Sequence, residues 1–175
     1  MTAGLDHLAI APVLVPFFAG ALMLLYDDRR RRAKLLISLG AALLLLVIAI
    51  ELLIRAKGSA LSGGNDIGFY LLGDWAMPFG IVLVIDRLSA LMLVLTQAVA
   101  LPVLFYASGG WDSHGRHFHA LFQFQLMGLN GAFVTGDLFN LFVFFEVLLI
   151  ASYVLLVHGQ GRERLRMGVH YVVLN

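Results

Sequence analysis

Glu146 is the residue whose position in the sequence most strongly suggests chemistry. It interrupts an apolar run from Leu138 to Val157. At a helical rise of about 1.5 Å per residue it lies roughly 13 Å from Asp137 and roughly 18 Å from His158, near the middle of a bilayer if the run spans one. A charged side chain there costs at least about 2.5–3.5 kcal/mol, and desolvation favours its neutral form. A carboxyl group that exchanges between the two forms suits a proton relay or a cation-coupled transporter. The alternative is a neutral glutamic acid that only packs between helices.

Other polar residues in apolar runs are candidates for a path beside this carboxyl group. Tyr153 is seven residues beyond Glu146 and is expected to share its helix face, while Asn140, six residues before, is expected to lie nearly alongside. The run from His119 to Thr135 shows a weaker form of the same pattern, because its polar residues Gln123 and Asn130 are seven residues apart and share a helix face. Hydrogen bonding between helices is the alternative for each of them. The candidate path residues are Asn140, Ser152, Tyr153, Gln123 and Asn130.

Histidine is a plausible proton carrier because its unperturbed pKa lies near 6.5. His158 and His170 flank a basic loop and are candidates for passing protons to Glu146 from the cytoplasm. Three further histidines gather around a helix entrance with Asp112 as the nearest carboxylate, and we interpret them as interfacial groups, with no metal site expected; they are His114, His117 and His119.

Acidic residues at the ends of apolar runs have simpler interpretations. Asp137 is expected to cap the helix that carries Glu146, because a carboxylate suits a helix N-terminus. Asp86 and Arg87 are expected to form a structural pair at the interface, with a cation entrance as the alternative, and Glu51 lies close enough to the interface to reach water. No nucleotide-binding loop or nucleophilic triad is present in the sequence, so we expect no enzymatic activity and no cofactor.

The elements that must position these residues are apolar runs long enough to cross a bilayer, which takes about 20 residues each. The sequence predicts an all-α transmembrane bundle with five complete spans and the start of a sixth from residue 169. The spans are expected at 7–26, 35–54, 88–106, 119–135 and 138–157. Residues 55–87 form a Gly-rich loop in which 79–85 is either a short strand or a helix entry. Because the sixth span is too short to cross, we expect residues 1–175 to be the N-terminal part of one longer domain.

Composition supports a lipid environment. The 175 residues are 61% hydrophobic and 13% charged with a net charge of +1, whereas soluble domains are about 45–50% apolar and about 25% charged. These values exclude a disordered chain and a nucleic-acid binder that acts through bulk charge. The chain has no cysteine, which excludes disulfides and thiolate metal sites.

Basic residues predict the orientation. They concentrate in the loops after the first, third and fifth spans, above all in the run from Arg29 to Lys34, whereas the opposite loops carry little net positive charge. By the positive-inside rule the N-terminus is predicted outside and the basic loops in the cytoplasm.

Two segments resemble a known superfamily. The segment Gly128–Tyr153 reads GLNGAFVTGDLFNLFVFFEVLLIASY, and Gly73–Ala90 reads GDWAMPFGIVLVIDRLSA. Both are similar to antiporter-like membrane subunits, the superfamily of the Mrp multisubunit monovalent cation/proton antiporters and the proton-pumping subunits of respiratory complex I. The chain looks most like the D-subunit branch of the Mrp family.

The resemblance implies a multi-pass subunit of a bacterial inner-membrane Na⁺(Li⁺, K⁺)/H⁺ antiporter, with other Mrp subunits as partners. It also implies that Glu146 is the proton-titrating acid of a hydrated path and pairs with a lysine on a helix beyond this chain. The alternatives are a proton-pumping subunit of complex I or of a membrane-bound hydrogenase, and a membrane scaffold without transport.

Overall fold

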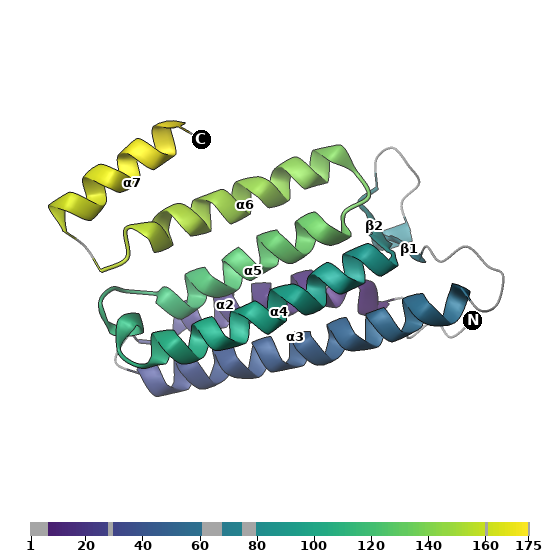
Figure 1. The fold of residues 1–175 in the computed structure, drawn as a ribbon, viewed down its shortest axis with the longest axis horizontal. Helices are drawn as coiled ribbons and strands as arrows, with labels where there is room; N and C mark the ends of the chain where they lie inside the picture. The colour runs from purple at the N-terminus through teal and green to yellow at the C-terminus, as the bar shows by residue number, and fades with distance from the viewer. Residues whose placement is uncertain (1–6, 28–29, 61–67, 75–79, 160, 175) are drawn as a thin grey trace.

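The computed structural model describes residues 7–27, 30–60, 68–74, 80–159 and 161–174. Their fold is a bundle of helices with one small hairpin (Figure 1). The short helix η1 (His7–Ile10) leads into α2 (Ala11–Leu25), followed by α3 (Arg31–Ala60), β1 (Gly68–Leu71), η2 (Leu72–Asp74), β2 (Val82–Ile85), α4 (Arg87–Ser108), η3 (Trp111–Ser113), α5 (Phe118–Val134), α6 (Leu138–Leu156) and α7 (Arg162–Leu174).

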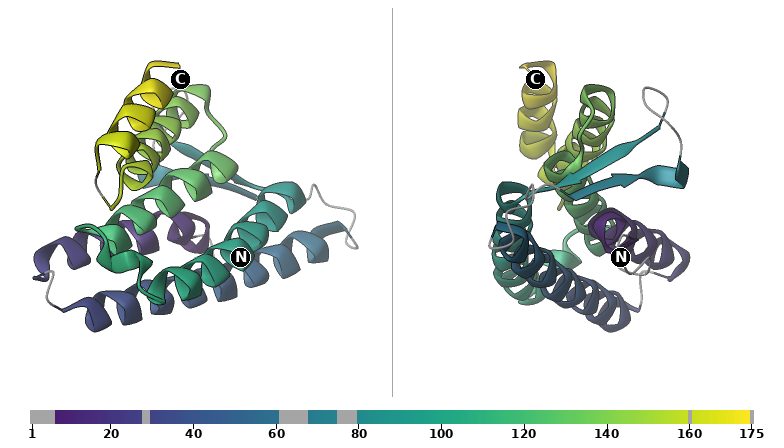
Figure 2. Two further views of the ribbon diagram at one scale, coloured as in Figure 1. Left: turned by 60° about the vertical axis from the view of Figure 1, so that its left-hand side comes forward. Right: turned by 90° about the vertical axis from the view of Figure 1, so that its right-hand side faces the viewer.

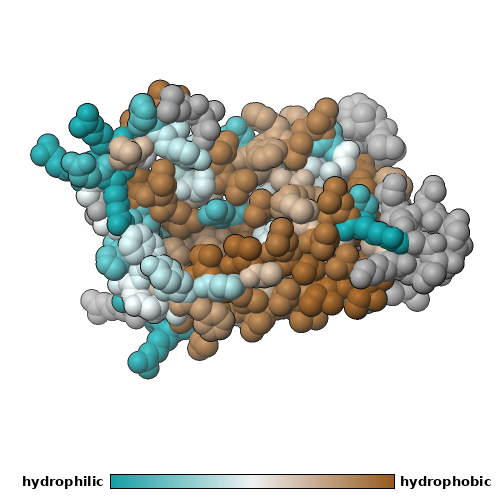
Figure 3. Space-filling view, in the orientation of Figure 1, coloured by the Kyte–Doolittle hydropathy of each residue, from teal (hydrophilic) through white to brown (hydrophobic). Residues whose placement is uncertain are grey.

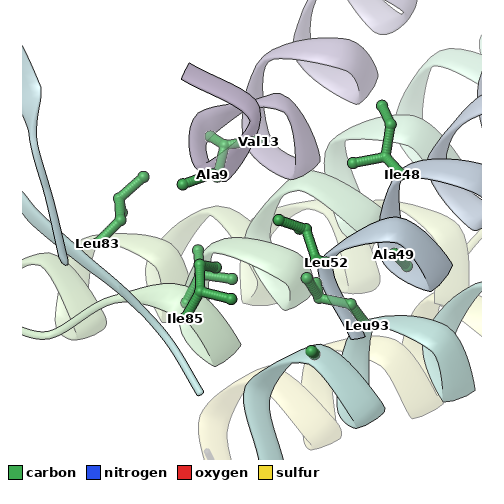
Figure 4. Close-up of a cluster of buried hydrophobic side chains, with 10 residues drawn as sticks. Ala9, Val13, Ile48, Ala49, Leu52, Leu83, Ile85 and Leu93 are labelled. Atoms are coloured by element: carbon green, nitrogen blue, oxygen red, sulfur yellow. The ribbon is translucent and has the colours of Figure 1, made fainter. Parts of the chain in front are cut away.

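The helices pack in pairs that bring distant segments together. α3 lies along α4, α2 along α5, and α5 along α6, while α7 stands at the edge and contacts α6 (Figures 1 and 2). One apolar core joins η1, α2, α3, β2 and α4 around Val13, Leu52, Leu83 and Leu93 (Figure 4). A second core lies where α4 meets α5, around Leu104 and Phe118.

The outer surface of the bundle is apolar. Large hydrophobic side chains such as Leu36, Val47 and Phe105 are more than half exposed, at 69%, 64% and 64%. Figure 3 shows a broad, mostly hydrophobic band across the middle of one face of the bundle. Four helical segments in the described part of the chain are long and apolar enough to cross a membrane: His7–Leu25, Arg31–Ala56, Arg87–Ser108 and Leu138–Leu156. The band is the surface that a chain spanning lipid presents.

The fourth predicted span, 119–135, corresponds to α5, whose 17 residues are fewer than in any of those four segments. It is the least exposed of the central helices, because α2, α4 and α6 all pack against it. A helix that is surrounded by other helices can include polar residues without exposing them to lipid, which explains its weaker apolar character.

Several boundaries differ from the sequence prediction. The second helix begins at Arg31 and continues to Ala60, beyond the predicted 35–54, because Arg, Lys and Glu are good helix formers. The segment 79–85 contains strand β2, which pairs antiparallel with β1, so the predicted loop holds a hairpin. The last helix begins at Arg162 and not at residue 169.

The loops gather at two ends of the bundle. At one end an Arg31 Nη2–Asp112 Oδ1 ion pair of 3.1 Å and a 3.2 Å hydrogen bond from His158 Nε2 to the Trp111 carbonyl connect the three basic loops. The hairpin, the α5–α6 turn and η1 lie together at the other end (Figure 1). The grouping of loops therefore agrees with the charge pattern, and the side of the membrane that each end faces stays a prediction.

Candidate functional site

Helix α6 holds Glu146 near its middle. The helix begins at the predicted cap, because Asp137 Oδ1 accepts a 3.2 Å hydrogen bond from the Phe139 amide. The preceding turn is fixed to the hairpin, since the Gly136 amide donates to the Val82 carbonyl at 2.9 Å and Leu83 bridges Thr135. These contacts set where α6 starts and which way its faces point.

One face of α6 packs tightly on α5. A Cβ atom on Gly128 would lie 2.7 Å from the Leu148 backbone nitrogen, and one on Gly131 would overlap the Phe144 ring. Glycine at these two positions therefore permits the close approach of α5 and α6.

Glu146 lies on the opposite face of α6. It is separated by about 160° around the helix axis from both Phe144 and Leu148, and its side chain is exposed. Its neighbours on this face include Phe142 and Ile150, which are 62% and 60% exposed. Within the described chain the carboxyl group therefore points away from the bundle, out of an apolar surface.

The path residues on α6 separate into two groups. Tyr153 shares the Glu146 face, as expected, and packs edge-on against Tyr171 of α7 with 5.8 Å between ring centroids. The expectation that Asn140 lies alongside is wrong, because six residues rotate it about 120° away. Asn140 is buried and donates a 2.9 Å hydrogen bond to Asp137 Oδ2. Ser152 bonds its own helix at the Leu149 carbonyl, 2.8 Å away.

The path residues on α5 face the bundle interior. Gln123 is fully buried, and its Nε2 donates to the carbonyl and hydroxyl oxygens of Ser38 at 3.1 and 3.0 Å. Asn130 is fully buried, donates to the Pro12 carbonyl at 3.0 Å and accepts from Gln97 Nε2 at 3.3 Å. These bonds connect α5 to α3, α2 and α4, and none reaches the Glu146 face.

The bond from Asn130 has a local cause in α2. A proline inside a helix has no N–H, so it leaves the carbonyl four residues earlier without its usual partner. In α2 Pro16 has this effect on the Pro12 carbonyl, and the Asn130 amide replaces the missing donor. The Pro12/Pro16 spacing is the signal in the sequence that this carbonyl needs a partner.

The two histidines proposed as proton carriers differ in environment. His158 is 5% exposed and lies against the Phe118 ring, with 5.1 Å between ring centroids. Burial is the main cause that lowers the pKa of His158, since its charged form is desolvated. His170 is exposed on α7.

Other polar groups form a cluster at the basic end. Lys34, which its sequence context places in a loop, lies in the first turn of α3 and is 4% exposed, and His119 is equally buried. Asp112 accepts from Arg31 on one oxygen and lies 3.3 Å from His119 Nε2 on the other. Among the described residues, no group of three metal-binding side chains has the proximity needed to hold an ion.

The remaining acids have structural partners. Asp86 caps α4 in a reciprocal arrangement with Ser89, and the hydrogen bond from the Ser89 amide lowers the pKa of Asp86. Glu51 pairs with Arg55 one helical turn later, with Oε1 to Nη2 at 2.6 Å.

No family model matches the chain, but individual relatives do. It is 48% identical over its whole length to the D subunit of a probable K⁺/H⁺ antiporter of Rhizobium meliloti, covering 32% of that protein. It is 40% identical over 98% of its length to the D subunit of a Na⁺/H⁺ antiporter of Alkalihalophilus pseudofirmus, covering 34% of it. The chain thus spans about a third of the length of these relatives.

Solved structures share the fold. A chain of the Mrp complex from Dietzia sp. matches 90% of this chain with a TM-score of 0.75 and 29% identity, and 28% of that chain is covered. A chain of the membrane-bound sulfane sulfur reductase, an archaeal respiratory membrane complex, matches 97% with a TM-score of 0.76 and 24% identity, and 34% of it is covered.

The fold and the relatives define the class: a multi-pass membrane protein with the helix arrangement of subunits in Mrp-type and respiratory membrane complexes. Within that class the chain is similar in sequence, over all or nearly all of its length, to D subunits of cation/proton antiporters. The resemblance identified from the sequence is confirmed.

Proposed function

We propose that this chain is part of a membrane subunit of a multisubunit Na⁺(Li⁺, K⁺)/H⁺ antiporter, in which Glu146 is the carboxyl group that takes up and releases protons. The similarity to antiporter D subunits over all of the chain supports this function. The other subunits of such a complex are the partners, and the bacterial inner membrane is the location. Residues 1–175 are the N-terminal part of one transmembrane domain, with α5 as a fifth span.

The position of Glu146 carries the proposal. The carboxyl group lies at mid-helix on an apolar face that none of the helices α2–α5 covers. A carboxylate exposed to lipid is unfavourable. This face therefore requires further helices that enclose a water-filled path beside Glu146 or carry a positively charged side chain. The relatives are about three times as long as this chain, which leaves room for such helices, including the lysine that the family resemblance implies.

The proposed mechanism needs only side chains and water. Protons enter a hydrated path along the Glu146 face and bind the carboxyl group, and their release on the other side is coupled to cation movement in the opposite direction. The proton gradient supplies the energy. Tyr153 is the path candidate on the same face, whereas Asn140, Ser152, Gln123 and Asn130 support the helices.

A proton-pumping subunit of a redox complex is the second candidate. The match to an archaeal respiratory membrane complex shows only that the fold is shared. Relatives at 48% and 40% identity are named antiporter subunits, and this favours the antiporter. Under the scaffold hypothesis, neutralising Glu146 would leave transport unchanged.

The experiment uses the full-length protein in its assembled complex. Glu146→Gln keeps the shape of the side chain and removes its titration, so we expect cation/proton exchange in inverted vesicles to be lost while the complex still assembles. Glu51→Gln is the matched control. Glu51 lies on α3 and not on α6, and its carboxylate pairs with Arg55 of the same helix. Full exchange by Glu146→Gln would refute the role proposed for this residue.

A further inference from the structure

Helix α4, like α2, contains a proline within its length, Pro102. A proline has no N–H, so the carbonyl group four residues earlier, that of Ala98, lacks its usual partner in the helix. In α2 the corresponding Pro12 carbonyl, freed by Pro16, is bonded by the Asn130 amide. The freed carbonyl of α4 therefore needs a donor of its own.

The polar side chains beside Ala98 are bonded elsewhere. The Thr96 hydroxyl donates to the Met92 carbonyl at 2.8 Å, and Gln97 Nε2 donates to Asn130 at 3.3 Å on the inner side of α4. Membrane helices tolerate proline where a Ser or Thr side chain, a local change of helix geometry, ordered water or a neighbouring helix bonds the freed carbonyl. The described α4 is one continuous α-helix, so its own residues do not supply the donor.

The Ala98 carbonyl lies at mid-membrane on an exposed apolar face. At about 1.5 Å per residue it is roughly 15–17 Å from either end of α4. Ala98 and Pro102 are exposed, and the adjacent Leu95 and Val99 are 53% and 57% exposed. Hydrocarbon tails have no hydrogen-bond donor, and a free backbone carbonyl among them is unfavourable. A helix from outside the described bundle is the remaining source of a donor.

The arrangement of the bundle favours a helix of a separate subunit. Helix α4 lies on the side of the bundle away from α7 (Figures 1 and 2). The chain leaves the bundle through α7, which contacts α6, and the Glu146 face of α6 also requires cover. The further helices of the longer relatives are therefore expected on that side, which leaves the α4 face for another protein.

We propose that the α4 face around Ala98 and Pro102 binds a transmembrane helix of another subunit, which donates a hydrogen bond from a hydroxyl or amide side chain to the Ala98 carbonyl. The small Ala98 side chain allows that helix to come close, as small residues do at helix contacts in membranes. Leu95 and Val99 supply apolar contact beside it. The proposal rests on the assembly of this chain into a multisubunit complex, and it does not depend on the role of Glu146.

The first experiment identifies the neighbour of this face in the full-length protein within its complex. The photoreactive amino acid p-benzoylphenylalanine replaces Leu95, a large exposed residue that shares the face of Ala98. After irradiation, mass spectrometry identifies the cross-linked product. We expect an adduct with another subunit. Adducts only within the same polypeptide, or only with lipid, would overturn the proposal.

The second experiment compares the two prolines. Pro102→Ala restores an N–H for the Ala98 carbonyl, so the donor on the partner helix loses its acceptor. We expect retention of the neighbouring subunit to weaken about three- to twentyfold, the effect of losing one hydrogen bond between membrane helices. Native mass spectrometry of the diluted complex measures this retention. Because Pro102 is exposed and alanine is the better helix former, the variant should fold.

Pro16→Ala is the matched control. It also restores an N–H within a helix, but the donor to its freed carbonyl is Asn130 of this same chain. Retention of the neighbouring subunit should therefore equal that of the wild type. Equal retention by Pro102→Ala and the wild type would contradict the proposed contact.

The outcomes are separate from those that test the proposed function. A wild-type protein that retains no other subunit would refute the multisubunit assignment itself. Glu146→Gln should retain the neighbouring subunit as the wild type does, because Glu146 lies on α6. Full exchange by Glu146→Gln would refute the role of that carboxyl group and leave the contact at α4 standing.

Discussion

Single side chains in this bundle compensate for defects in the helices beside them. Asn130 donates to the Pro12 carbonyl that Pro16 leaves without a partner. Hydrogen bonds between helices in membranes are worth about 0.6 kcal/mol on average and at most about 1.7. This bond should lie near the upper limit, because the alternative is an unpaired carbonyl.

We therefore predict that Asn130→Leu lowers the free energy of unfolding by about 1–2 kcal/mol. In a Pro16→Ala background the loss should be smaller, because the restored N–H of residue 16 can pair with the Pro12 carbonyl. Unfolding of the full-length protein in mixed micelles measures both. Ser152→Ala, at a hydroxyl that bonds only its own helix, is the control. An equal loss in both backgrounds would contradict the explanation.

His158 gives a pH dependence that can be worked out from its burial. Because burial lowers its folded-state pKa below the unfolded value, the unfolded chain binds a proton more readily once the pH falls below about 6.5. Stability should thus be unaffected by this group above that pH and decrease as the pH falls from about 6.5 toward the folded pKa. Thermal midpoints at pH 7.5 and 5.5 should differ less for His158→Gln than for the wild type.

At the scale of elements, the contact between α5 and α6 determines where Glu146 points. A Cβ at residue 128 would lie 2.7 Å from the Leu148 nitrogen and 2.9 Å from the Phe144 carbonyl oxygen, both backbone atoms that cannot move alone. Gly128→Ala should separate the two helices, lower the free energy of unfolding by about 1–3 kcal/mol and reduce exchange.

Gly40→Ala is the matched control for this prediction. Gly40 lies within α3, and among the described residues no atom beyond its own stretch of helix comes within 4 Å of an added Cβ. Alanine is the better helix former by about 0.5–1 kcal/mol, so this variant should be neutral or more stable and should exchange normally. The same measurements apply to both variants. Equal stability of the two would show that the close contact at residue 128 does not determine how near α6 packs to α5.

The sequence predicts the elements well and the rotation of helices about their axes poorly. Apolar length locates the helices, and the predicted Asp137 cap is confirmed. The placement of Asn140 beside Glu146 is wrong because a separation of six residues rotates a side chain about 120° around the helix, as the spacing alone already implies. Which side of α6 faces inward depends on the tight contact with α5, which the sequence does not reveal. The sequence does not distinguish a strand from a helix at the hairpin. Residues 81–85 are all apolar and are either β-branched or Leu, and such a short run fits both structures equally. The loop position expected for Lys34 is wrong because helix ends depend on tertiary contacts.

At the scale of the whole molecule, the two ends of the bundle should face opposite sides of the membrane. The chain contains no cysteine, so single cysteines can report the side in a full-length protein freed of any others. Ser113→Cys at the basic end should react with a membrane-impermeant maleimide only from the cytoplasm. Phe69→Cys in the hairpin, which is 68% exposed in the wild type, should react only from outside. The reverse pattern would invert the predicted topology.

The attachment of the hairpin also has a mechanical consequence. Strand β2 holds the α5–α6 turn through the Val82 carbonyl and the Leu83 bridge, and an added Cβ on Gly136 would collide with the Val84 side chain. Helix α6 is thereby clamped at one end, while its other end leads into the peripheral α7. If α6 tilts, it should rotate about this fixed N-terminal end. The displacement of Glu146 would then grow with the tilt angle and with its distance from that end, which is about half the length of the helix. A partner protein bound to the hairpin would then change the position of Glu146 without contacting its carboxyl group.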